Sequence, residues 1–200
     1  MTSFRLFVAA ASALFLAFTL PFATAQDKSV KEQSTAKKAG KLSKDDTQSL
    51  EKMARADMAE IEAGKLAAQK ASTPEVKKYG EHMVKEHGKM LEEGKQLAQA
   101  KGVKPPSAPD KKHQDALKKL QGMSGEEFDR QYMQQMVKDH EEALALVEKC
   151  AKEAKDADLK AHAQKGAPHI KEHLAMARKI NDSLGASAGA GSRAKGETKK

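Results

Sequence analysis

The chain has one cysteine, no tryptophan and few other aromatic residues, and each shortage excludes something. A single cysteine, Cys150, cannot form an internal disulfide, so a hydrophobic core or a bound ligand must stabilise the fold. Aromatic residues make up only 4% of the sequence, which argues against a nucleic-acid partner. No serine or cysteine is spaced to pair with a mid-helix histidine, so a nucleophilic triad has no candidate and we do not expect an enzyme.

The first 25 residues have the pattern of a cleaved secretory signal peptide. Arg5 precedes an uncharged apolar run over residues 6–22, and Ala23-Thr24-Ala25 then forms a small-x-small cleavage site. The alternative is a retained membrane anchor, but the run is short for a membrane span and contains Pro21. We therefore predict a periplasmic or otherwise exported protein, without a transmembrane segment after cleavage near Ala25.

The chain is basic, with a formal net charge of +8. A basic surface favours an anionic envelope component, such as an acidic polymer or an anionic membrane face, as a partner. The same charge is also typical of solvated helix surfaces with a lysine-rich tail. The sequence leaves these two interpretations, and the oligomeric state, open.

Apolar residues recur at the spacing of one helical face in four long segments, and no segment alternates as a strand does. We therefore predict an all-α four-helix bundle over residues 43–184, with helices over about 47–70, 73–101, 125–154 and 157–184. Thr73-Pro74 and Ser124 to Glu127 are typical helix starts, the second as a capping box. Residues 26–42 should form a flexible leader and residues 185–200 a disordered basic tail.

A connector over residues 102–123 separates the second and third helices. It begins with an extended stretch at Pro105-Pro106, and a short helix over about 110–121 should follow. Its length allows it to cross the whole bundle, as in ferritin-like folds, or to fold back at one end. The sequence alone does not choose between these topologies.

A short signature of a hydrophobe, lysine, an acid and histidine recurs in three helices. It ends in His87, His140 and His173, each on the apolar face of its helix and near the helix midpoint. Asp57 takes the corresponding place in the first helix. Because a mid-helix residue keeps its level whichever way the helix runs, we expect these four residues to share one central layer.

A buried carboxylate with three imidazoles is a ligand set that suits a transition metal, zinc or copper. The predicted ligands are Asp57, His87, His140 and His173. Secondary candidates are Glu60, His169, Met83 and Met136, and the thioethers of the methionines would favour copper. The alternative is a hydrogen-bonded polar layer without metal, in which Tyr79, Tyr132 and Asp57 satisfy the histidines.

Several segments together resemble a known family. They are Ala56 to Ala67, Val76-Lys77-Lys78-Tyr79 with Met83-Val84 and His87, Phe128-Asp129 with Tyr132, Met136-Val137 and His140, and Leu159-Lys160 with Pro168, Ile170 and His173-Leu174. Their order and spacing resemble an exported bacterial family of unknown function, domain of unknown function 4142, often labelled predicted outer membrane protein. The resemblance covers about residues 48–182. It implies a ferritin-like four-helix bundle and an envelope location, and it implies no established activity.

Two functions follow from these observations. The first is a non-enzymatic, stress-related envelope protein that binds a transition metal in the central layer. The second is a structural or interaction module that binds an anionic envelope partner, with a purely structural polar layer. A di-iron oxidoreductase is less favoured, because the Glu-x-x-His pairs of di-iron bundles are missing around His87 and His173.

Overall fold

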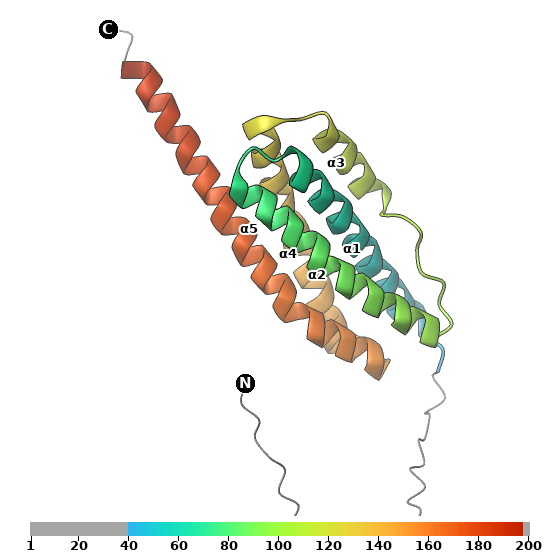
Figure 1. The fold of residues 1–200 in the computed structure, drawn as a ribbon. Helices are drawn as coiled ribbons and strands as arrows, with labels where there is room; N and C mark the ends of the chain where they lie inside the picture. The colour runs from blue at the N-terminus through green and yellow to red at the C-terminus, as the bar shows by residue number, and fades with distance from the viewer. Residues whose placement is uncertain (1–39, 198–200) are drawn as a thin grey trace, which may run out of the picture. The chain divides into compact units, whose positions relative to one another are not determined.

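The computed structural model describes residues 40–197, and side chains as far as residue 186. Within this part of the chain there are five helices and no strand, as the apolar spacing predicts (Figure 1). The four long helices pack side by side, and the short helix α3 lies against α1 and α4. The predicted signal peptide and residues 26–39 of the predicted leader lie outside the described residues. The helices are α1 (Lys44–Lys70), α2 (Pro74–Ala100), α3 (Lys111–Gln121), α4 (Gly125–Glu153) and α5 (Ala157–Glu197).

Side-chain caps explain why three of the helices begin where they do. The Ser43 hydroxyl accepts a hydrogen bond from the backbone N–H of Asp46, and Thr73 caps α2 in the same way in front of Pro74. Asp110 caps α3. The capping box predicted at the start of α4 is wrong, since the Ser124 side chain makes no cap hydrogen bond. The next residue, Gly125, has a left-handed φ of 61°, so the backbone after Ser124 does not have the geometry of a capping box.

Contacts at the two ends of the bundle establish the direction of each helix. At one end Asp129, near the start of α4, accepts hydrogen bonds from the backbone of Ser72 and Thr73 in the α1–α2 turn. At the other end Asp46, at the start of α1, accepts from the backbone N–H of Asp156, between α4 and α5. Helix α4 is therefore antiparallel to α1 and parallel to α2. The connector crosses the length of the bundle, which settles the choice that the sequence left open.

The α1–α2 pair is held together by a close backbone approach. A Cβ atom on Gly64 would lie 2.6 Å from the carbonyl oxygen of Gly80, and one on Gly80 would lie 2.7 Å from the Cβ of Ala67. Larger residues at these two positions would force α1 and α2 apart. The glycine pair therefore fixes the position of α1 against α2, about two helical turns from Asp57 and His87.

The core consists of two apolar clusters, one on each side of a polar layer at mid-bundle. The first lies toward the α1–α2 turn and includes Tyr79, Met83, Phe128, Tyr132 and Met136. The second lies toward the other end and includes Leu50, Val147, Cys150, Leu159 and Ile170. Cys150 is 4% exposed, so it is a small buried side chain, as predicted.

The last helix is longer than predicted. The sequence places its end at Leu184-Gly185, with a disordered tail after it, whereas α5 continues to Glu197 (Figure 1). Alanine, which has the highest helix propensity, recurs between the glycines of this segment and supports the continuation. None of the helices in residues 40–197 combines the length and the apolar character that a membrane span requires.

Candidate metal centre

Three histidines from three helices meet in the polar layer. His87 of α2, His140 of α4 and His173 of α5 are each 1% exposed. One ring nitrogen of each lies within 4.8 Å of the corresponding nitrogen of the other two. We call these three residues the histidine triad. The mid-helix position of each residue, together with its place on the apolar face, brings them to one level as the sequence predicts.

Asp57 of α1 contacts the triad through one of its histidines. Its Oδ1 atom accepts a hydrogen bond from Nδ1 of His87 at 2.8 Å, and the residue is 6% exposed. This contact fixes the His87 ring with its other nitrogen, Nε2, turned toward His140. The sequence placed Asp57 among the direct ligands, whereas in the structure its carboxylate lies behind His87.

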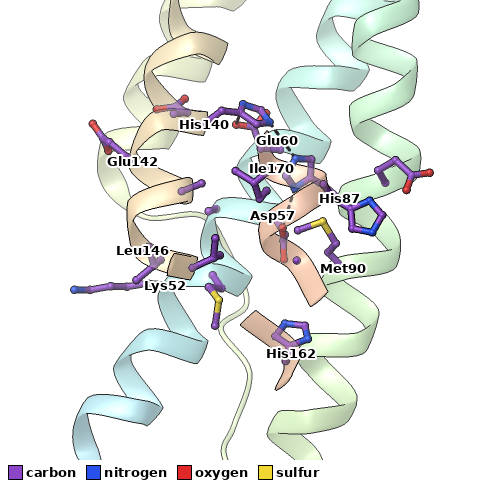
Figure 2. Close-up of a pocket in the computed structure, with 18 of the residues that line it drawn as sticks. Lys52, Asp57, Glu60, His87, Met90, His140, Glu142, Leu146, His162 and Ile170 are labelled. Atoms are coloured by element: carbon purple, nitrogen blue, oxygen red, sulfur yellow. Dashed lines mark hydrogen bonds and ion pairs between the residues drawn. The ribbon is translucent and has the colours of Figure 1, made fainter. Parts of the chain in front are cut away.

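The ring of His140 is fixed in the same way by the backbone. Its Nδ1 atom donates to the carbonyl oxygen of Met136 at 2.9 Å, which requires the proton on Nδ1 and leaves a lone pair on Nε2. The Nε2 atoms of His87 and His140 are 3.4 Å apart and face each other (Figure 2). Two facing lone pairs repel unless a proton or a metal ion lies between them. The two rings are therefore arranged so that a proton or a metal ion between their Nε2 atoms would relieve the repulsion.

Burial keeps two of the imidazoles neutral. Burial, together with the neighbouring His87, lowers the pKa of His140 to about 3. Burial and the surrounding imidazoles of His87, His140, His82 and His169 lower the pKa of His173 to about 2. Both are uncharged at neutral pH and therefore retain a nitrogen lone pair, which metal coordination needs. Nδ1 of His173 is buried and has no hydrogen-bond partner among the described residues.

Glu60, a secondary candidate, lies beside the triad. Its Oε1 atom is 3.7 Å from Nδ1 of His140, while Oε2 is buried without a partner in the described residues. Burial raises the pKa of this carboxyl group well above its usual range, and the nearby Asp139 and Asp57 raise it further. A protonated Glu60 is therefore a neutral neighbour of the triad.

The two tyrosines do not satisfy the histidine rings. The Tyr79 hydroxyl donates to the backbone carbonyl of His173 at 3.4 Å, and the Tyr132 hydroxyl is buried without a partner in the part of the chain described. The predicted alternative of a hydrogen-bonded layer assigned both hydroxyls to the histidines. Of the partners that it proposed, only Asp57 bonds to a triad ring.

A cavity of about 550 Å³ adjoins the triad and passes between the helices (Figure 2). His87 and His140 form part of its wall, and Met90 and His162 line it farther from the triad. His169, a secondary candidate, is exposed and lines the same cavity. Met83 and Met136 lie instead in the first apolar cluster, where Met83 is 0% and Met136 is 1% exposed.

Sequence reasoning missed two histidines of this cavity, His113 and His162. Five of the seven histidines in the chain line the cavity, His173 completes the triad, and the ring of His82 lies 5.3 Å from that of His173. His162 was detectable, since it lies on α5 two turns before His169. His113 was not, because its place depends on the path of the connector.

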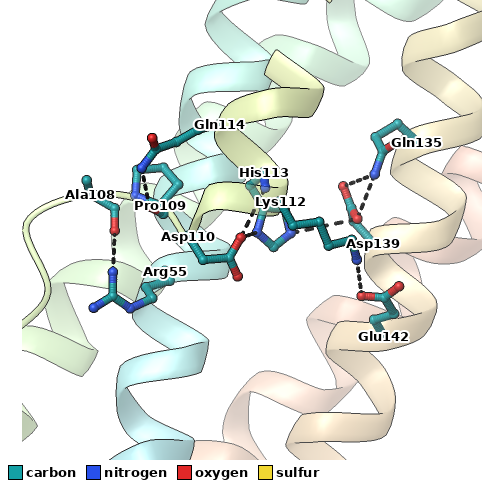
Figure 3. A network of polar contacts seen from close by, with 10 residues as sticks. All are labelled: Arg55, Ala108, Pro109, Asp110, Lys112, His113, Gln114, Gln135, Asp139 and Glu142. Atoms are coloured by element: carbon teal, nitrogen blue, oxygen red, sulfur yellow. Dashed lines mark hydrogen bonds and ion pairs between the residues drawn. The ribbon is translucent and has the colours of Figure 1, made fainter. Parts of the chain in front are cut away.

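Helix α3 closes the cavity on the side of α1 and α4 with a network of polar contacts (Figure 3). Nδ1 of His113 is 2.8 Å from Asp110, and its Nε2 is 3.8 Å from Asp139 of α4. Lys112 binds Glu142 of α4 beside them. Burial raises the pKa of Asp139, although the amide of Gln135 donates to it. These side chains are already engaged with one another.

Three solved structures are similar to this chain in fold. A DUF305 fragment from Deinococcus radiodurans has a TM-score of 0.63 at 12% identity, with 73% of this chain and 99% of that chain covered. A DUF305 protein from Streptomyces coelicolor has a TM-score of 0.60 at 12% identity, covering 70% and 93%. CopM in the Cu(II)-bound form has a TM-score of 0.59 at 19% identity, covering 69% and 96%. At these identities the likeness concerns the fold alone.

A comparison with curated proteins finds no match. A family model described as domain of unknown function (DUF4142) matches residues 31–180, which is most of the chain. The match includes the polar layer and all seven histidines.

Proposed function

This chain belongs to the DUF4142 family, and we propose that it is an exported, non-enzymatic protein that binds one transition-metal ion between His87, His140 and His173. The observation that carries the proposal is the 3.4 Å separation of the facing Nε2 atoms of His87 and His140. Two nitrogens bound to one tetrahedral ion at the usual distances lie about 3.3 Å apart. His173 places a ring nitrogen within 4.8 Å of those of the other two histidines, and its buried Nδ1 has no partner among the described residues.

In this proposal Asp57 orients a ligand and does not bind the metal. A histidine that binds a metal through one ring nitrogen commonly donates from the other to a carboxylate or a carbonyl oxygen. His87 has such a partner in Asp57, and His140 has one in the carbonyl of Met136. These hydrogen bonds hold both rings in the tautomer that binds a metal. We therefore move Asp57 from the predicted ligands to the residues that position them.

Copper is our first choice of metal, and zinc is the second. Three neutral imidazoles suit both ions. The fold is similar to that of CopM, a protein solved with Cu(II) bound. The thioether of Met90 in the adjoining cavity adds a soft group, which favours copper over zinc.

The N-terminal sequence supports an exported, periplasmic location for the metal site. Residues 1–25 read as a cleaved signal, and no described helix fits a membrane span. The connector that crosses the bundle supports the finer assignment of a ferritin-like arrangement. A role in metal sequestration under stress is consistent with an ion held in a buried layer of an exported protein.

One observation favours the alternative of a purely structural layer. Two of the three histidines already have a hydrogen-bond partner on one nitrogen, as a structural layer requires. A proton shared between His87 and His140 would then take the place of the metal. In this case the basic surface, which would bind an anionic envelope component, would carry the function.

Metal titration of the purified apo protein separates the two functions. The proposal predicts one Cu(II) ion per chain by calorimetry at neutral pH, with binding lost in His87→Ala. As the control, His113→Ala removes a cavity histidine outside the triad and should leave the stoichiometry at one. Exclusion of both Cu(II) and Zn(II) by the wild-type protein would contradict the proposal. Salt-sensitive binding to anionic vesicles by such a protein would support the alternative instead.

A further inference from the structure

The two walls of the cavity beside the triad have different side-chain contacts. This difference bears on how an ion reaches the buried triad. On the α3 side, His113 contacts Asp110 and Asp139, and Lys112 binds Glu142. That wall is closed by side chains that already have partners. A metal ion that entered there would have to break several ion pairs.

The wall between α2 and α5 has one exposed ion pair, between Lys165 and Glu93, and two histidines without such partners. His162 and His169 lie there, and neither makes a hydrogen bond or an ion pair with any described residue. His169 is exposed and lies about one helical turn before His173, whereas His162 lies about three turns before it. His162 and Met90 are half-buried. All three offer nitrogen or sulfur donors, which bind copper ions.

Two glycines leave the seam between α2 and α5 with little side-chain volume. Gly94 faces His162, since a Cβ atom on Gly94 would lie 3.7 Å from Nε2 of His162. Gly166 faces Met90, with 3.8 Å between its ideal Cβ and the terminal methyl group. The space at Gly166 would accept a side chain, but that side chain would then occupy the wall of the cavity. Pro168, two residues after Gly166, also lacks the backbone N–H that would complete the α5 hydrogen bonds here.

We propose that the seam between α2 and α5 is the route by which copper reaches the triad, with His169, His162 and Met90 as transient ligands. This inference rests on the proposed function, because it assumes that the triad is the destination. It adds a second role to the chain: imidazole and thioether donors in the cavity wall capture the ion and pass it to the triad by ligand exchange.

A group on the route has a distinct kinetic signature. Because it contacts the ion only in passing, its loss slows loading and release by the same factor and leaves the dissociation constant unchanged. Loss of a triad ligand instead raises the dissociation constant. Copper loading can be followed by quenching of tyrosine fluorescence, since the chain has no tryptophan and Tyr79 lies 6.4 Å from His140 between ring centroids.

The experiment is stopped-flow loading of the purified apo protein with Cu(II), and release to a chelator. We expect Gly166→Leu, which fills the wall beside Met90, to slow both steps about tenfold with an unchanged dissociation constant. The double variant His162→Ala/His169→Ala, which leaves α5 without added bulk, should slow both steps by a few-fold. The matched control is Gly88→Leu in α2, where an added Cβ meets nothing within 4 Å.

The outcomes are distinguishable. Loading at the wild-type rate in both route variants overturns the route while the proposed function stands. A slower rate in His113→Ala, with no change in the route variants, places access on the α3 side and also overturns it. A raised dissociation constant in His162→Ala/His169→Ala would make these residues part of the equilibrium site and contradict a transient role. If the wild-type protein takes up no copper, the proposed function fails, and the route fails with it.

Discussion

The ends of the bundle and its middle bury polar groups in opposite ways. At one end the carboxylate of Asp129, 0% exposed, accepts three hydrogen bonds, from the N–H and hydroxyl of Ser72 and the N–H of Thr73. At the other end Asp46 accepts from two backbone N–H groups, those of Lys155 and Asp156. In the middle, Glu60 and His173 each keep a buried polar atom without a partner in the described chain.

This difference indicates a separate role for each region. Buried polar groups with all partners present fix a structure, because any rearrangement leaves them unpaired. The end carboxylates therefore join elements that are far apart in sequence and fix the crossover topology. Buried polar atoms without partners destabilise a fold, and they persist where a ligand completes them. The unpartnered atoms of the middle are therefore where a bound ion, if the proposal holds, would complete the buried polar groups.

Asp129→Ala should have the largest effect on stability. It leaves three donors at the α1–α2 turn without an acceptor, so the free energy of unfolding should fall by about 3 kcal/mol or more. Copper affinity should remain within about threefold of wild type, a change below 1 kcal/mol. Urea unfolding of the apo protein and copper titration measure the two. As a control, Asp115→Ala, which breaks an exposed ion pair with Lys111, should change stability by less than about 0.5 kcal/mol.

His173→Leu should reverse that pattern. It removes a proposed ligand while it keeps volume in the core, so copper affinity should fall at least about 100-fold, or about 2.8 kcal/mol. The apo protein should be as stable as wild type or more stable, because a buried nitrogen without a partner is gone. Calorimetry and urea unfolding give both values. If copper affinity were unchanged while stability fell, the triad would be structural.

Asp57→Asn should have an intermediate effect on copper. The amide oxygen can still accept from Nδ1 of His87, but more weakly than a carboxylate, and loss of such outer partners lowers metal affinity 10- to 100-fold. We expect about tenfold. An effect as large as that of His173→Leu would show that Asp57 binds the ion directly, as the sequence suggested.

Glu60→Gln should produce a small gain in stability. The raised pKa of Glu60 means that the folded chain holds a proton which the unfolded chain releases above its ordinary value of 4.5, so folding becomes less favourable as pH rises. The neutral amide removes this penalty, and we expect about 1 kcal/mol of added stability at neutral pH and none below pH 4. Asp129→Asn, the matched change at the end of the bundle, should lower stability at neutral pH. A loss in both variants would remove the distinction between the two regions.

The sequence predicted the helices and the layer because both follow from local rules. Apolar spacing and caps such as Ser43 and Thr73 define the helices, and a mid-helix residue such as His140 keeps its level in any topology. The family was also recognisable from the order and spacing of these residues, and its model matches residues 31–180.

What the sequence could not provide depends on contacts between distant parts of the chain. The path of the connector, and with it the position of His113, follows from where Asp129 and Asp46 find partners. The orientation of Asp57 toward His87 depends on side-chain rotamers in the packed layer. From the sequence alone, a residue that binds a metal and a residue that only orients a ligand therefore look the same. The cavity follows from small residues on facing helices, and no single segment contains that information.

The central claim is that the triad holds a metal ion, and locating the ion tests it most directly. Crystals of the protein grown with Cu(II) and measured at the copper absorption edge give the position of every bound copper by anomalous scattering. The account predicts one strong peak bonded to His87, His140 and His173, with Asp57 still hydrogen-bonded to Nδ1 of His87. A copper-saturated protein with no peak between these three rings, or with copper only at exposed histidines, would contradict it.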